Sequence, residues 1–566
     1  MRNQLTPLDI AVFLIYLVGV TAYGYYIYQS KKKGEQSTKD YFLAEGSLTW
    51  WAIGASMIAS NISAEQFIGM SGSGFKVGVA VAAYEWVAAI VLIIVAVFFM
   101  PVFLKEKIFT MPQFLEQRYN STLSLIMSIF WLFLYVLVNL TSILYLGALA
   151  LSNLVGGDTF HVIIVLLALF SILISIGGMK VVGYTDVVQV VVLVVGGLVT
   201  TYIALTLVSD KFGLGGGAIS GFNALMSKAP DHFHMIFPKP TADTPQVEVD
   251  KYLSLPGIAM YLAGQWIVNL NYWGCNQYIT QRALGADLHT ARTGILFAAI
   301  LKLMMPVIVM LPGIAAYVLY KNGSLQAEMS STGAFNSDNA YSAILTFLPD
   351  GLKGLSMAAL TAAIVASMAG KVNSISTIFT LDIYKRYLNT EATEKKQVWV
   401  GRLTILASVV ISVALTWKDL LGIGGEGGFQ FIQKYTGFIS PGILAIFLLG
   451  LFWKRTTATA AIVGVLAGFV MSVFFNNYAP AVLGPETLLY TAFPNGRGTY
   501  EIPFLICMGL SFAITMLLMV AISLVGPRVS AKAIELQPGL FRVSRQTLVL
   551  IVIILLLITA LYTKFW

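Results

Sequence analysis

A cluster of polar side chains interrupts the long apolar segment 48–74. It consists of Asn61, Ser63, Glu65 and Gln66. Polar and ionisable groups inside a bilayer cost about 2–3 kcal/mol each on insertion scales, so they are rare unless they face a cavity or a partner. Serine and asparagine also compete for backbone hydrogen bonds. We therefore predict a membrane helix that is broken near its middle and lines a hydrated site, where freed carbonyl groups are suitable cation ligands.

Two residues of opposite charge are predicted to lie at similar depth. Lys302 follows the expected inner end of segment 293–320 by nine residues, which is roughly 13 Å along a helix. A lysine stem recovers only part of that distance by snorkelling. Glu85 lies similarly far from the outer end of segment 77–104. A carboxylate and an ammonium group stabilise each other's charged forms, and both bind hydroxyl groups. A protonated, purely structural Glu85 is the alternative.

Neutral amides occur in or near two interrupted segments, 48–74 and 255–277. The amides are Asn61, Gln66, Asn269 and Gln433. Because an amide both donates and accepts hydrogen bonds, this set suits an uncharged, polyhydroxylated ligand. The apolar face of such a ligand could stack on Tyr272, Trp273, Tyr84, Phe429 and Met70. Contacts between helices are the alternative role for the amides, and core packing is the alternative for the apolar group.

A cation site is predicted beside the first break. Ala363 and Ser367 are four residues apart and share a helix face. If that face meets the carbonyl groups around Ala59 and Ile62, the oxygens form a cage suited to sodium. The alternative is that the Ser367 hydroxyl bonds to the backbone of its own helix.

The composition is that of a polytopic membrane protein. The chain has 566 residues, of which 57% are hydrophobic and 11% charged, and its mean hydropathy is +0.80. Soluble proteins carry about 25% charged residues. Two cysteines provide no disulfide framework. Although the net charge is +8, no basic run is longer than Lys31–Lys33, so nucleic acid is not an expected partner.

Fourteen apolar windows are long enough to cross about 30 Å of hydrocarbon as helices, and no alternating pattern indicates a membrane barrel. They lie near 9–28, 48–74, 77–104, 122–152, 159–177, 184–208, 255–277, 293–320, 352–384, 399–417, 428–453, 457–477, 502–526 and 546–565. The predicted fold is therefore all-α. Segment 9–28 lacks a basic n-region and a cleavage site, so it is expected to be a retained span.

Basic residues indicate the orientation. With the amino terminus outside, 21 of the 35 lysines and arginines lie on the inner side and 11 on the outer side. Four of the outer ones belong to one long loop, where the positive-inside rule is weakest. We expect a multi-pass protein of the inner (plasma) membrane with both termini outside. The long outer loops would be 210–254, 321–350 and 478–500, and His232 and His234 are expected to be solvated there.

The second and the seventh of the fourteen segments, 48–74 and 255–277, are both interrupted by polar residues. If each begins a repeat of five spans, the odd number of spans inverts the second repeat relative to the first. Paired interruptions of this kind indicate the binding site of a secondary transporter. The predicted divisions are 1–47 (first helix and inner loop), 48–209 (first five-helix repeat), 210–254 (outer loop), 255–453 (second, inverted repeat) and 454–566 (three peripheral helices).

Long motifs carry a resemblance to a known family. They include Y-F-L-A-E-G-S from Tyr41, N-I-S-A-E-Q-F-I-G-M from Asn61, N-Y-W-G-C-N-Q-Y from Asn271 and T-I-F-T-L-D-I-Y-K from Thr377. The chain resembles the sodium:solute symporter family over nearly all fourteen segments, most of all its bacterial sodium/galactose and sodium/glucose symporters. The resemblance implies a five-plus-five inverted-repeat (LeuT-like) core with two discontinuous helices and transport by alternating access.

The resemblance also implies roles for individual residues. The sugar site would be Asn61, Gln66, Glu85, Asn269, Lys302 and Gln433. Met70, Tyr84 and Phe429 would form the outer gate, and Tyr272 the inner gate. Sodium would be held by the carbonyl groups of Ala59, Ile62 and Ala363 and the hydroxyl of Ser367, with Asp186 near the sodium exit path.

Several positions depart from the family pattern. Ala88 replaces a sugar-contacting serine, and Ala366 replaces one of two adjacent serines at the sodium site. Ala369 stands where relatives with two sodium sites have a hydroxyl, so one sodium per sugar is expected. Lys371 replaces an apolar residue one turn beyond Ser367. It could weaken sodium binding, pair with Asp186 or face the inner vestibule.

The leading hypothesis is sodium-driven import of a neutral monosaccharide of the galactose or glucose type. The alternatives are the same machinery carrying myo-inositol or another polar solute, and a sugar sensor without coupled transport. An enzyme is not expected, because no metal cluster, nucleophile elbow or phosphate loop is present. The sequence does not indicate an oligomeric state.

Overall fold

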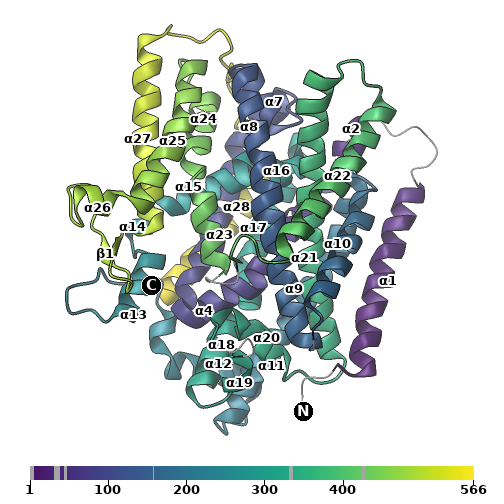
Figure 1. Cartoon of the computed structure of the whole chain (residues 1–566), viewed down its shortest axis with the longest axis vertical. Coiled ribbons are helices and arrows are strands. Elements are labelled where there is room, and N and C mark those ends of the chain that lie inside the picture. The colour runs from purple at the N-terminus through teal and green to yellow at the C-terminus, as the bar shows by residue number, and fades with distance from the viewer. Residues whose placement is uncertain (1–4, 31–37, 44–47, 157, 331–334, 424–427) are drawn as a thin grey trace.

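The computed structural model is a bundle of helices whose axes mostly lie along the long axis of the molecule (Figure 1). It describes residues 5–566 apart from 31–37, 44–47, 157, 331–334 and 424–427. Strands in these residues are limited to β1 (Phe493–Pro494) and β2 (Tyr500–Glu501), which form one antiparallel pair. The predicted all-α fold is confirmed.

The chain up to residue 211 forms the first group of helices. They are α1 (Pro7–Ser30), α2 (Thr38–Leu43), α3 (Trp50–Asn61), η2 (Glu65–Met70), α4 (Ser71–Val77), η3 (Gly78–Ala82), α5 (Ala83–Ile94), η4 (Val95–Phe99), α6 (Met100–Lys105), α7 (Met111–Arg118), α8 (Ser121–Phe133), η5 (Leu134–Leu140), α9 (Thr141–Val155), α10 (Phe160–Ser175) and α11 (Met179–Lys211).

A second group follows a connection that contains α12 (Gly217–Lys228), η6 (Pro230–Phe233) and α13 (Gln246–Ser254). Its helices are α14 (Ala259–Leu262), α15 (Gly264–Leu270), η7 (Asn271–Cys275), α16 (Gln277–Leu284), α17 (Leu288–Val309), α18 (Leu311–Lys321), α19 (Gln326–Met329), η8 (Ser337–Asn339), α20 (Ala340–Leu345), α21 (Leu352–Thr377), η9 (Ile378–Leu388), α22 (Glu394–Thr416), α23 (Gly428–Gly437) and α24 (Ser440–Phe452).

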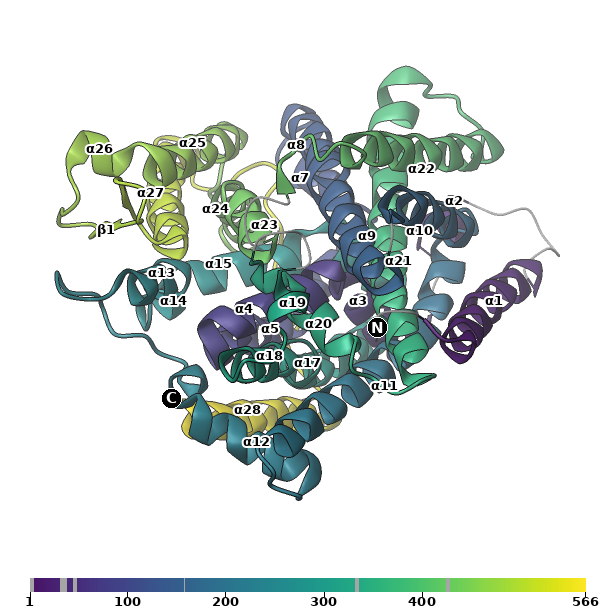
Figure 2. The same cartoon turned by 60° about the horizontal axis from the view of Figure 1, so that its bottom comes forward.

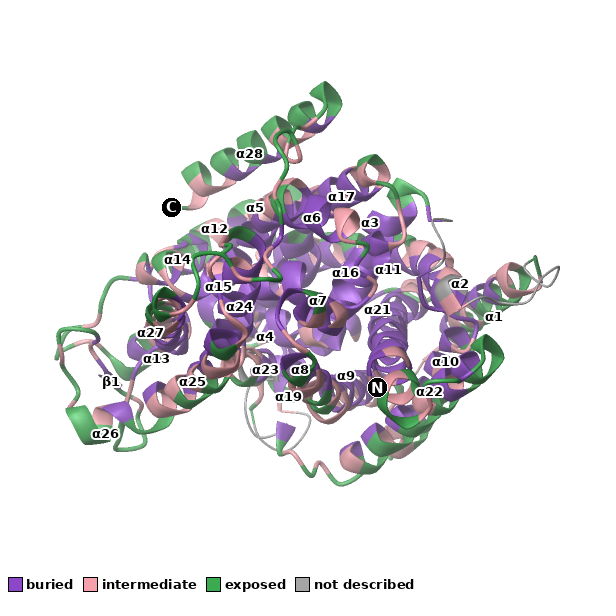
Figure 3. Ribbon diagram, turned by 90° about the horizontal axis from the view of Figure 1, so that it is seen from above, coloured by how far each residue is buried: buried purple, intermediate pink, exposed green. Residues whose placement is uncertain are grey.

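The last part of the chain lies at the edges of the bundle. It contains α25 (Ala458–Asn477), α26 (Ala479–Leu483), α27 (Phe504–Val525) and α28 (Arg545–Phe565). Figure 2 shows α25 to α27 together at one edge and α1 near another. Helix α28 packs against α17 and α5. Seen from above, α21 is almost wholly buried, whereas α28 exposes an apolar face (Figure 3). An exposed apolar helix face is suited to contact with lipid.

Ten helical stretches in the described residues are long and apolar enough to cross a membrane. Two shorter apolar helices, Phe160–Ser175 and Ser440–Phe452, also correspond to predicted crossings. The two remaining predicted crossings are the interrupted segments 48–74 and 255–277. The structure thus has a helical counterpart for each of the fourteen windows.

Both segments predicted to be interrupted are broken. Helix α3 ends at Asn61, and Ile62 has an extended backbone before η2 begins. Helix η7 ends at Cys275, and Asn276 is extended before α16 begins. At the first break the Ser63 amide donates to the side-chain oxygen Oε1 of Gln66 at 3.3 Å. It therefore does not donate to a backbone carbonyl of α3, and the helix does not continue. Polar side chains therefore replace backbone partners at the break, as the sequence predicts.

Glycines bring α3 and α17 into close contact. A Cβ atom on Gly54 would lie 2.6 Å from the Gly294 carbonyl oxygen, and one on Gly294 would lie 2.8 Å from the Trp50 carbonyl oxygen. Any larger residue would push these two helices apart. The close approach places the end of α3, with Asn61, near the middle of α17, which carries Lys302.

The two ends of the chain contact the connections that were predicted to lie on one side of the membrane. The Asp9 carboxylate accepts hydrogen bonds from the amides of Gly351 and Gly354, beside connection 321–350. The carbonyl of Phe565 accepts from the Met235 amide in connection 210–254.

One expectation about these connections was wrong. His232 was expected to be solvated, but it is 3% exposed, and its ring stacks on Tyr317 with centroids 3.9 Å apart. Its Nε2 atom lies 3.0 Å from the Phe75 carbonyl oxygen. The connection folds back onto the bundle because Gly78, with φ +65°, leaves room for the His232 backbone. His234 is exposed, as expected.

Candidate functional site

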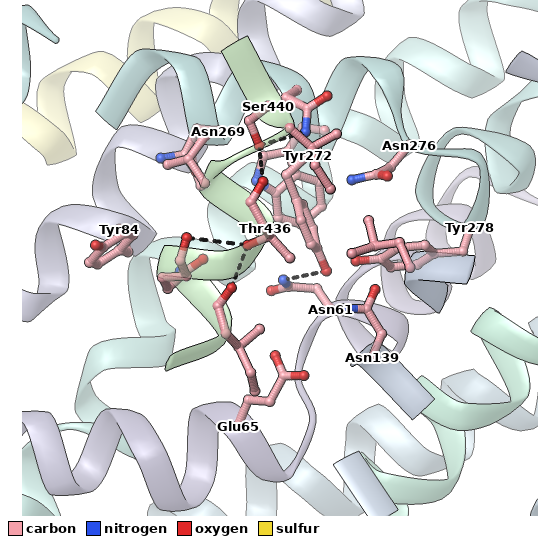
Figure 4. Close-up of a pocket in the computed structure, with 18 of the residues that line it drawn as sticks. Asn61, Glu65, Tyr84, Asn139, Asn269, Tyr272, Asn276, Tyr278, Thr436 and Ser440 are labelled. Carbon is pink, nitrogen blue, oxygen red and sulfur yellow. Dashed lines mark hydrogen bonds between the residues drawn. The ribbon is translucent and has the colours of Figure 1, made fainter. Parts of the chain in front are cut away.

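A polar pocket lies between the two helix breaks (Figure 4). All six residues predicted for the sugar site line it: Asn61, Gln66, Glu85, Asn269, Lys302 and Gln433. Three predicted gate residues, Tyr84, Phe429 and Tyr272, also line it. Met70 is buried in η2 and does not belong to the lining. The fold therefore gathers side chains that are up to about 370 positions apart in the sequence.

Glu85 and Lys302 form an ion pair in the pocket wall. Their side chains are 3% and 1% exposed, so both charges are removed from water. The Lys302 ammonium also lies 5.3 Å from the centre of the Trp273 ring. A buried charge is tolerated only when it is paired, and each of these groups supplies the other's counter-charge. The pair leaves no net charge at this part of the site.

The amides are held by neighbours on the broken helices. Asn61 Nδ2 donates to the Tyr272 hydroxyl at 2.9 Å (Figure 4), and Asn269 Nδ2 donates to the Gln265 carbonyl at 2.9 Å. Gln66 Oε1 accepts from the amide and the hydroxyl of Ser63, both at 3.3 Å. The Asn61 Oδ1 atom is buried without a partner in the described residues. That atom is an available acceptor for a ligand hydroxyl.

Aromatic rings form two groups in the pocket wall. Tyr84 and Phe429 meet edge to face with centroids 5.2 Å apart. Tyr272 contacts Trp273 and Tyr278, with centroid distances of 5.1 and 5.6 Å. The pocket therefore offers apolar faces beside hydrogen-bonding groups, which is the usual composition of a small-molecule site.

The structure adds lining residues that the sequence analysis did not assign to the sugar site. They are Glu65, Asn139, Asn276, Tyr278, Lys371, Thr436 and Ser440, among others. Thr436 and Ser440 are four residues apart and share a helix face, which is a signal the sequence contains. Asn139 is a single amide in an apolar stretch. For Asn276 the signal is its place at the second break, where its side chain accepts from Tyr135 at 2.9 Å.

The predicted sodium ligand Ser367 faces the first break. Its hydroxyl donates to the Ser60 carbonyl of α3 at 3.0 Å and not to its own helix. The residues expected to offer carbonyl ligands, Ala59, Ile62 and Ala363, are fully buried. A hydroxyl that meets a backbone carbonyl at the end of a broken helix provides oxygen donors of the kind that an alkali cation requires. This part of the structure therefore fits the predicted cargo ion.

Asp186 belongs to a buried network next to this position. Its Oδ2 atom accepts from the Ser56 hydroxyl at 2.5 Å and lies 3.9 Å from the Arg282 guanidinium. Arg282 in turn donates to the Ser60 hydroxyl at 2.6 Å. The network links α11 and α16 to the last turn of α3. Asp186, which the sequence offered as a possible partner for Lys371, is paired with Arg282 in the structure.

The fold and the site define a class: a membrane transporter with two discontinuous helices around a central pocket. The structure is similar to a solved structure of a Na⁺-coupled sialic acid symporter in a substrate-bound outward-open state, with a TM-score of 0.75 and 23% identity. The alignment covers 93% of this chain and 99% of that one. This likeness shows the LeuT-like fold.

Sequence comparisons give the family. Residues 41–468 match the model of the sodium:solute symporter family. A sodium/glucose cotransporter of Vibrio parahaemolyticus is 46% identical over 498 residues, which cover 87% of this chain and 89% of that protein. A human sodium/myo-inositol cotransporter 2 is 32% identical, over 83% of this chain and 70% of its own length. The chain belongs to the sodium:solute symporter family.

Proposed function

We propose that this protein imports a neutral monosaccharide of the galactose or glucose type by sodium-coupled symport. The observation that carries the proposal is that one pocket at both helix breaks combines a neutralised ion pair, several amides and aromatic rings in its wall. A pyranose presents hydroxyl groups around its edge and C–H groups on its faces, so it needs both kinds of wall. The Vibrio relative, whose name specifies sodium and glucose, supports the same substrate class.

The charges favour a neutral solute. Lys302 and Glu85 compensate each other, so a substrate carboxylate would have to compete with Glu85 for the ammonium. Breaking a buried pair in this way costs several kcal/mol. Sugar hydroxyls can bind both partners without separating them. Myo-inositol satisfies the same chemistry and is the second candidate, since a 32% identical relative carries that name.

Sodium is the coupling ion in this proposal, with one ion bound per sugar at Ser367 and the carbonyl groups of the first break. Sodium binding there would hold α3 against α21, and this would favour the arrangement of Asn61 and Gln66 that binds sugar. We place the protein in the inner membrane with both termini outside, on the basis of the distribution of lysine and arginine.

The test is uptake by proteoliposomes that contain the purified protein. Labelled galactose, glucose, fucose, myo-inositol and proline are offered under inward gradients of sodium, potassium or protons. Accumulation of galactose or glucose above equilibrium under a sodium gradient alone is the expected result. Gln66→Ala should abolish it, since this residue lines the pocket.

Other outcomes would revise the proposal in specific ways. Preferred accumulation of myo-inositol would replace the substrate but keep the mechanism. Sugar-induced current without accumulation would favour a sensor over a symporter. Uptake driven equally by a potassium or proton gradient would contradict sodium coupling.

A further inference from the structure

A buried ammonium group contacts the hydroxyl that is predicted to bind sodium. Lys371 Nζ donates to Ser367 Oγ at 2.9 Å, while Ser367 Oγ donates its own hydrogen to the Ser60 carbonyl at 3.0 Å. Because that hydrogen points to α3, a lone pair of the hydroxyl faces the ammonium. A sodium ion bound to Ser367 would use the same side of the oxygen. The lysine and the ion therefore compete for one ligand.

Ionisable side chains already crowd the surroundings of Ser367. Arg282 pairs with Asp186, and Lys371 lies in the pocket wall together with Glu65. The Lys371, Arg282 and Asp186 side chains are almost completely buried, so water screens them poorly. Adding sodium while the ammonium stays in place would bring a second positive charge into contact with the same hydroxyl, beside the nearby Arg282. The lysine must move for the ion to bind well.

The pocket offers the ammonium an alternative position. Glu65 and Lys371 both line it, and Glu65 is near enough to interact electrostatically with the lysine. Glu65 Oε1 is buried and has no hydrogen-bond partner among the described residues. Lys371 Nζ also lies 4.5 Å from the centre of the Tyr278 ring, which faces the pocket. A rotation of the flexible lysine stem toward Glu65 would satisfy that unpaired oxygen.

We propose that the Lys371 ammonium is a tethered cation that occupies the sodium position in the sodium-free protein, and that sodium binding displaces it toward Glu65. The inference rests on the proposed sodium site at Ser367. Its consequence is that this chain binds sodium more weakly than the same chain with a neutral residue at 371. Because Lys371 and Glu65 both line the sugar pocket, the displacement changes the surface that the sugar meets.

The test measures sodium binding without transport. Purified protein in detergent is titrated with sodium chloride against choline chloride at constant ionic strength, with tryptophan fluorescence and the unfolding temperature as readouts. Lys371→Met should lower the apparent Kd for sodium at least tenfold, and Lys371→Arg should keep it weak. Lys353→Met is the matched control, because Lys353 is a buried lysine near the other end of α21. It should leave the Kd unchanged.

A second measurement uses the wild-type protein and so does not depend on the folding of a variant. Amine-specific labelling of Lys371, followed by mass spectrometry, should be several-fold faster in sodium than in choline. An unchanged or higher sodium Kd in Lys371→Met, or labelling that sodium does not accelerate, would overturn the proposal while leaving sodium coupling intact. Absence of sodium binding in both proteins would overturn the coupling and this inference together.

Discussion

Asn61 and Tyr272 join the two discontinuous helices directly. Asn61 is the last residue of α3, Tyr272 lies in η7, and the amide donates to the phenol oxygen at 2.9 Å. The hydrogen bond crosses the pocket wall at the level where both helices break. It therefore ties the first half of the core to the second in the conformation that the structure presents.

Removing this hydrogen bond should loosen the contact between the halves. Tyr272→Phe keeps the ring but leaves Asn61 Nδ2 without its acceptor, at a cost of about 1 kcal/mol or more. The apparent unfolding temperature in detergent should fall. Tyr84→Phe is the matched control, because the Tyr84 hydroxyl is buried without a partner in the described residues. An equal effect of both changes would contradict a specific role for the Asn61 contact.

Substitutions in the Glu85–Lys302 pair should affect stability and transport differently. Glu85→Gln or Lys302→Met alone leaves one buried charge uncompensated, which costs about 3–5 kcal/mol. The double variant removes both charges and should recover most of the unfolding temperature. It should nevertheless fail to accumulate sugar, because the pocket has lost its charged hydrogen-bonding groups. Normal uptake by the double variant would show that the pair has only a structural role.

Arg118 is expected to stabilise the end of α24. Its buried guanidinium donates to the carbonyl groups of Gly450, Trp453 and Thr456 at 2.8–3.1 Å. Positive charge at a helix carboxyl terminus is favourable, and hydrogen bonds from charged groups contribute about 1.5–3 kcal/mol each. Arg118→Met should therefore lower the unfolding temperature strongly, and Arg118→Lys should restore it only in part. Arg528→Met, at an exposed arginine, should have little effect.

His232 should make stability depend on pH. Burial lowers the pKa of this imidazole below its usual value of 6.5, so the folded state favours the neutral ring. Between the lowered pKa and 6.5 the unfolded chain binds more protons, so stability rises with pH and is lost as pH falls through that range. His232→Gln should weaken this loss in pH-dependent thermal unfolding. His234→Gln, on the same connection, is the comparison. An unchanged pH profile in His232→Gln would refute the assignment.

The sequence was sufficient to predict both helix breaks. Polar residues such as Asn61 and Gln66 are costly in a helix that only crosses a membrane. In the structure the Gln66 side chain accepts the hydrogen bond of the Ser63 amide in place of a backbone carbonyl. An additional irregularity at Ala263 could not be predicted. It arises where Gly264 packs against the Leu505 backbone, with room for no side chain. Contacts of that kind depend on tertiary packing.

The directions in which side chains point were the second feature that the sequence could not predict. The sequence showed Lys371 one turn beyond Ser367, but three roles remained open for it because the rotation of α21 against α3 was unknown: weakening sodium binding, pairing with Asp186 or facing the inner vestibule. The structure shows the bond to Ser367. The burial of His232 was missed for a related reason, since loop composition does not reveal that a connection folds back onto the bundle.

The central claim is that a sodium ion at the first helix break and a neutral sugar in the adjoining pocket each raise the affinity for the other. Its most direct test is a pair of equilibrium titrations on the purified protein: sugar with and without saturating sodium, and sodium with and without saturating sugar. Linkage requires the two Kd values to fall by the same factor, and we expect at least fivefold. A sugar Kd that is the same in sodium and in choline would contradict the account.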